Sequence, residues 1–71
     1  MASCMTKIWL VFYIAGRIIG SAGPEADINL CWRHAAIEKS IFNRLVPSLQ
    51  DNLLVDCEFH VDQPQATLEV S

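Results

Sequence analysis

The sequence predicts a small α+β protein with an apolar N-terminal helical segment, one amphipathic helix and a C-terminal β-hairpin. Three observations predict it: an uncharged apolar run early in the chain, helical periodicity in the middle and strict alternation near the end. A chain of 71 residues is too short to form more than one domain of the usual size. Its hydrophobic content of 52% and charged content of 18% exclude a chain that is disordered throughout.

Residues 1–22 have the layout of a secretory signal peptide. Lys7 precedes an uncharged apolar run, and the small residues Gly20 and Ala22 stand where a peptidase that cuts after Ala22 needs small side chains. This pattern divides the chain into a leader at 1–22 and a small α+β unit at 23–71.

Two alternatives remain for the apolar run. Arg17 lies between the run and the cleavage site, which is unusual, so residues 8–20 could instead remain as an uncleaved membrane anchor. A full span needs about 20 apolar residues, and this segment is shorter. A run so rich in β-branched and aromatic residues also fits a buried central strand.

Residues 24–46 have the periodicity of a helix. Pro24 suits the first helical position, and the helix should end at Val46 because a residue that precedes proline disfavours the α conformation. Apolar side chains occupy much of the helix circumference, so the helix needs cover on more than one side. The candidate partner-binding residues on it are Trp32, Ile41, Phe42 and Leu45.

The alternation of apolar and polar residues in 54–71 predicts an antiparallel hairpin. Positions 55, 57, 59 and 61 are apolar and alternate with polar residues, which is the pattern of a half-buried strand. Pro64 lies in a four-residue turn, and a second alternating run follows it at 66–70. The apolar face of this hairpin should pack on the helix.

The three cysteines are Cys4, Cys31 and Cys57. Cleavage after Ala22 would remove Cys4 and leave an even pair, which favours a Cys31–Cys57 disulfide in a secreted protein. Closing a loop of about 25 residues would stabilise the fold by about 3 kcal/mol in the chain-entropy account. The alternative is two buried free thiols that pack as small hydrophobic groups.

Both Cys31-x-x-His34 and Cys57-x-x-His60 resemble halves of a zinc site. Strand residues three apart point to opposite faces, however, so Cys57 and His60 could not both reach one ion. We therefore expect no metal and no cofactor. A Cys–His nucleophilic pair would also lack a recognisable orienting group and a pocket of the usual size, so we expect no catalytic residue and no enzymatic activity.

Residues 51–71 carry five acids and no base, which argues against nucleic-acid binding because such a surface repels phosphate. The sequence favours a small secreted, non-enzymatic protein that acts by binding another macromolecule, an unidentified protein partner. One alternative is a membrane-associated small subunit of a larger assembly, attached through residues 8–20. Another is a truncated redox or metal-binding intracellular domain.

Overall fold

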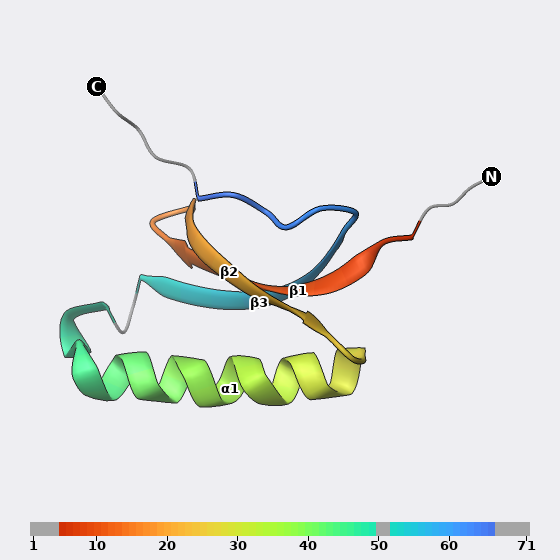
Figure 1. Ribbon diagram of the computed structural model, residues 1–71. Coiled ribbons are helices and arrows are strands. Elements are labelled where there is room, and N and C mark those ends of the chain that lie inside the picture. Colours follow the sequence, from red (N-terminus) through yellow and green to blue (C-terminus); the bar gives the residue numbers. More distant parts are fainter. Residues whose placement is uncertain (1–4, 50–51, 67–71) are drawn as a thin grey trace, which may run out of the picture.

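The computed structural model describes residues 5–49 and 52–66 (Figure 1). Along the chain these form β1 (Lys7–Ile14), β2 (Arg17–Glu25), α1 (Ile28–Leu45), the short 3₁₀ helix η1 (Pro47–Leu49) and β3 (Leu53–His60). The strands make one antiparallel sheet in the order β2-β1-β3, and α1 packs across one of its faces. The architecture is therefore two layers, a helix on a sheet.

The apolar N-terminal run forms the central strand of this sheet. β1 pairs with β2 on one side and with β3 on the other, and Trp9, Leu10 and Val11 are 6%, 2% and 0% exposed. The predicted N-terminal helical segment is therefore wrong. Its β-branched and aromatic residues suit a strand that is buried on both faces, which was the alternative interpretation.

A tight turn at Ala15 and Gly16 joins β1 to β2. Both residues have positive φ angles, 53° and 80°, as two-residue hairpin turns between antiparallel strands require. Arg17 follows as the exposed first residue of an edge strand, which explains a charge so close to an apolar run. The pairing of β2 with β1 is interrupted by two irregularities, so β2 is the less regular edge of the sheet.

The helix begins later than the sequence predicts. Asp27 is its N-cap, and the Asp27 side chain accepts a hydrogen bond of 2.8 Å from the backbone N–H of Leu30. Pro24 is part of β2 and follows a cis peptide bond, rather than opening the helix. The helix ends at the predicted place, where the N–H of Val46 donates to the carbonyl of Phe42.

The predicted C-terminal hairpin is replaced by a different pairing. β3 exists as an alternating strand, but it pairs along its whole length with β1, from Lys7 opposite His60 to Ile14 opposite Leu53. Residues 61–66 are not a strand, and residues 67–71 of the predicted second strand lie outside the described residues. An isolated two-stranded hairpin is only marginally stable in water, whereas pairing with the buried strand β1 makes β3 part of a three-stranded sheet.

The 61–66 segment crosses the sheet face opposite α1 (Figure 1). The hydroxyl of Ser21 donates to the carbonyl of Pro64 at 2.8 Å, and the indole N–H of Trp9 donates to the carbonyl of His60 at 3.0 Å. The sheet is thus covered on both sides. On the helix side the buried cluster is Leu10, Cys31, Ala35, Leu53 and Val55.

Candidate functional site

A disulfide joins α1 to the middle of β3. Cys31 and Cys57 are 26 residues apart in sequence, with Cα atoms 6.2 Å apart, and Cys31 is fully buried. Cys57 reaches the helix because it shares the apolar face of β3 with Val55. The predicted disulfide is confirmed. Neither sulfur in it can act as a thiolate nucleophile or metal ligand while the bond is intact.

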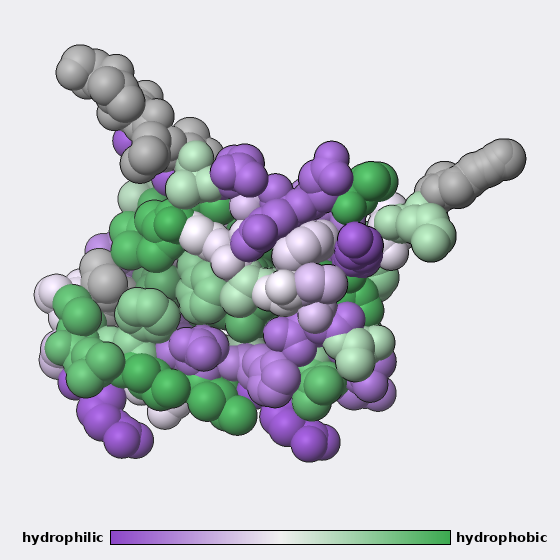
Figure 2. Space-filling model, in the orientation of Figure 1, coloured by the Kyte–Doolittle hydropathy of each residue, from purple (hydrophilic) through white to green (hydrophobic). Residues whose placement is uncertain are grey.

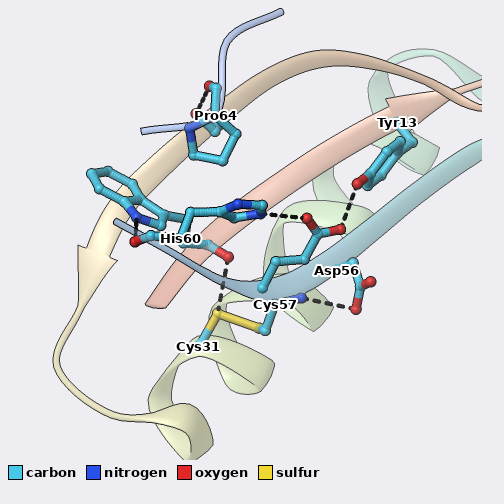
Figure 3. A network of polar contacts seen from close by, with 9 residues as sticks. Tyr13, Cys31, Asp56, Cys57, His60 and Pro64 are labelled. Carbon is cyan, nitrogen blue, oxygen red and sulfur yellow. Dashed lines mark hydrogen bonds and ion pairs between the residues drawn. A yellow bond between two sulfur atoms is a disulfide. The ribbon is translucent and has the colours of Figure 1, made fainter. Parts of the chain in front are cut away.

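A polar network lies on the sheet face opposite α1 (Figure 3). The hydroxyl of Tyr13 donates to Oε2 of Glu58 at 2.5 Å, and Nε2 of His60 lies 2.7 Å from Oε1 of the same carboxylate. Glu58 and His60 are two residues apart on β3 and therefore point to one face, and Tyr13 reaches them from β1. One carboxylate thus holds two partners from adjacent strands.

The network shifts the ionisation of two of its members. The hydrogen bond to Glu58 is the main cause that raises the pKa of Tyr13 to about 12, and burial and the charges of Glu58 and Asp56 act in the same direction. For Glu58, burial alone would raise the pKa. The hydrogen bonds from Tyr13 and His60, with the charge of His60, outweigh burial and lower the pKa of this carboxyl. Glu58 is therefore held as an anion.

The chemistry open to this network is limited. Its carboxylate already has two partners, and Tyr13 is held as a neutral phenol, a weak nucleophile at ordinary pH. The second histidine belongs to a separate pair, in which His34 Nδ1 lies 2.7 Å from Oε1 of Glu25. Within the described ranges, no group of three or more His, Cys, Asp or Glu side chains is arranged to hold a metal ion.

Sequence reasoning missed Tyr13 because it assigned that residue to a leader. The alternation of β3 did indicate that positions 56, 58 and 60 share a face, but nothing in the sequence indicated that β1 lies beside them. Long-range strand pairing joins Tyr13 to Glu58 across 45 residues. A local pattern carries no information about such a pairing.

An open groove of about 370 Å³ runs between β2 and α1. Its lining is mainly apolar: Phe12, Ile19, Gly20, Ser21, Ala22, Glu38 and Phe42. Two of the lining residues, Phe12 and Phe42, have their rings in edge-to-face contact with centroids 5.9 Å apart. The groove lies on the helix side of the sheet, and the Tyr13 network lies on the opposite side, so the two do not form one site.

The predicted partner-binding residues lie in three different settings. Ile41 and Leu45 are 41% and 71% exposed, and with Ile37, at 49%, they form a line at successive intervals of four residues, here called the α1 stripe. Phe42 packs inward on Phe12. Trp32 is 47% exposed but lies nine residues before Ile41, about half a turn away around the helix. Ile37 was not among the predicted residues.

Comparison with known proteins finds no matching family, no similar curated protein and no similar solved structure. Among the described residues, α1 and the other helical segment lack the length and apolar character that crossing a bilayer requires. The fold and the surface of the chain itself are therefore the basis for a functional proposal.

Proposed function

We propose that the chain is a small, disulfide-bonded, non-enzymatic protein that binds another protein through the α1 stripe. The observation that carries this proposal is the exposure of Ile37, Ile41 and Leu45 in one line along α1. Such a line of apolar anchors is the means by which a helix docks on an apolar surface of a partner.

The surroundings of the stripe support this proposal. Phe42, one residue after Ile41, lines the apolar groove between α1 and β2. Apolar side chains, green in Figure 2, run along the face of α1 that this view presents, with polar ones between them. A groove next to exposed aliphatic side chains gives a partner both a recess and a flat apolar surface to bury.

The separation of the Tyr13–Glu58–His60 network from the groove, whose one titratable residue among the described lining residues is Glu38, supports a role without catalysis. An enzyme needs its acid, base or nucleophile within hydrogen-bond reach of a bound substrate. Here the hydrogen-bonded carboxylate of Glu58 lies on the face opposite α1, and the two described cysteines are bonded to each other. The concave surface near Phe42 is therefore suited to contact and has no reactive group from that network.

The disulfide supports action in an oxidising compartment. Disulfides persist in secreted, periplasmic or lumenal proteins and are rare where glutathione and thioredoxin keep thiols reduced. The Cys31–Cys57 bond lies between α1 and β3, and a chain this short has a small core to stabilise it otherwise. We propose an extracytosolic location on this ground.

A photo-crosslinking amino acid placed at Ile41 tests the binding proposal, with the same label at Ser40 as the matched control. Ser40 is exposed and lies about 100° around the helix from Ile41, on the solvent side of α1. We expect a discrete adduct from the Ile41 label in the native compartment, which excess unlabelled protein suppresses. Equal labelling from both positions, or no adduct from either, would overturn the proposal.

A further inference from the structure

The two edges of the sheet differ in their capacity to pair with another strand. β2 carries two irregularities, two glycines and Pro24, features that protect an edge from further pairing. β3 pairs with β1 over eight successive positions without a bulge, and it contains neither glycine nor proline. The outer edge of β3 is therefore the regular, pairing-competent edge.

The side chains of β3 define what could pair there. Leu54 and Phe59 are 53% and 58% exposed, one on each face of the strand. Asp56 and Glu58 share the face away from α1, and Asp62 follows shortly after. No lysine or arginine occurs between residues 52 and 66. The face away from α1 thus carries two carboxylates beside Leu54, and the face toward α1 carries Phe59.

This charge pattern disfavours a second copy of the chain as the occupant. Antiparallel pairing of two β3 strands in the registers that join most of their length places Asp56 opposite Asp56 or Glu58 of the other copy. Like charges directly opposite each other destabilise a strand pair, and opposite charges stabilise it. A strand with basic side chains at these positions fits instead.

The helix adds an apolar surface beside the same edge. His34 faces β2, since its ring lies 2.7 Å from Glu25. Trp32 lies about 160° around α1 from His34, on the flank directed toward β3. Trp32 and Phe59 are both about half exposed, at 47% and 58%. Apolar side chains of an added strand would meet this surface on the helix side.

We propose that the outer edge of β3, with which no strand of the described residues pairs, binds an extended segment of a partner protein in which basic and apolar residues alternate. The backbone of the segment continues the sheet, its basic side chains lie toward Asp56 and Glu58, and its apolar side chains lie toward Trp32 and Phe59. The disulfide holds β3 against α1, so both halves of this surface are fixed before binding. This surface is separate from the α1 stripe, and the two proposals can fail independently.

Synthetic peptides test this inference with the intact oxidised protein. The probe is an eight-residue Lys-Val alternating peptide with blocked ends, which matches the length of β3. We expect saturable chemical-shift changes in the β3 backbone amides. Two peptides of equal charge, N-methylated at odd or even positions, separate pairing from simple charge attraction. One of them should bind about tenfold or more weakly, since its methyl groups block the hydrogen bonds to β3.

Variants supply the second arm of the test. Asp56→Asn removes a charge but keeps the oxygen that accepts from the N–H of Cys57, and Glu38→Gln is the matched control on the other flank of the helix. We expect weaker binding to Asp56→Asn and unchanged binding to Glu38→Gln. Equal affinity for both N-methylated peptides, shifts in which the β3 amides take no part, no binding, or self-association through β3 without peptide would each overturn the inference.

Discussion

Leu10 lies directly opposite Cys57 in the antiparallel pairing of β1 with β3. The middle of the apolar N-terminal run is thus the neighbour of the disulfide that ties β3 to α1. Leu10 itself is 2% exposed and belongs to the cluster that includes Cys31. The residues that look most like a removable leader are therefore the part of the chain on which the other elements assemble.

Truncating Leu10 should be strongly destabilising. Leu10→Ala leaves a cavity under α1, and such core truncations cost about 2–5 kcal/mol. Leu54→Ala is the matched control, since Leu54 is on the neighbouring strand and 53% exposed. Urea unfolding followed by circular dichroism measures both variants. Equal losses of unfolding free energy would show that β1 is not in the core.

Loss of the disulfide should lower stability without changing the element order. Closing a loop of 26 residues constrains the unfolded chain by about 3–4 kcal/mol in the chain-entropy account. The Cys31→Ala/Cys57→Ala double variant and the reduced wild-type protein should both unfold at lower urea. A reduced protein as stable as the oxidised one would contradict the placement of the bond between α1 and β3.

Tyr13 provides a pH-dependent signal that no other residue obscures, because it is the one tyrosine of the chain. Its pKa in the fold is about 12, against 10.0 ordinarily, so tyrosinate absorbance should appear at a higher pH in the folded than in the unfolded protein. The folded state keeps the proton longer, and this contribution to stability is present below pH 10 and is lost as pH rises toward 12.

Glu58→Gln tests the cause of that shift. The neutral amide accepts a weaker hydrogen bond and carries no charge, so the pKa of Tyr13 should move back toward 10.0. Asp56→Asn, which removes a smaller contribution, should move it less. Ultraviolet titration measures the pKa of Tyr13, and circular dichroism at each pH shows whether the protein is still folded. A folded wild-type protein with half-ionised Tyr13 at pH 10 would refute the network.

The two tryptophans should differ in their accessibility to a quencher. Trp9 is 6% exposed, with its indole N–H donating to the carbonyl of His60, and Trp32 is 47% exposed on α1. Acrylamide should quench the Trp32→Phe variant, which retains Trp9, several-fold less than the Trp9→Phe variant, which retains Trp32. Similar quenching of both variants would contradict this prediction, because it would mean that solvent reaches the sheet face opposite α1.

The sequence predicted the parts of the fold that depend on local patterns. The helical period placed α1 to within a few residues, and the alternation of 55–62 indicated a strand. Both predictions concern residues close together in the chain, and the periodicity of apolar side chains reports directly on such local structure.

The order of the strands and the Tyr13–Glu58 contact depend on pairing between residues that are distant in the sequence. A short apolar run reads equally as a leader or as a buried strand, and only its neighbours decide between them. The Ala15–Gly16 turn carries a weak signal, because alanine rarely adopts a positive φ. Without β1 in the sheet, β3 had to be paired with the residues after Pro64, and the Tyr13–Glu58 contact was invisible. One misassigned segment thus produced both errors.

Native-state hydrogen exchange of the β1 amides tests the central claim most directly. We predict that Leu10, Val11 and Phe12 exchange among the slowest amides of the chain, through global unfolding, since β1 is hydrogen-bonded on both sides. Rapid exchange at these three amides, with α1 and β3 still protected, would show that the N-terminal run lies outside the folded core.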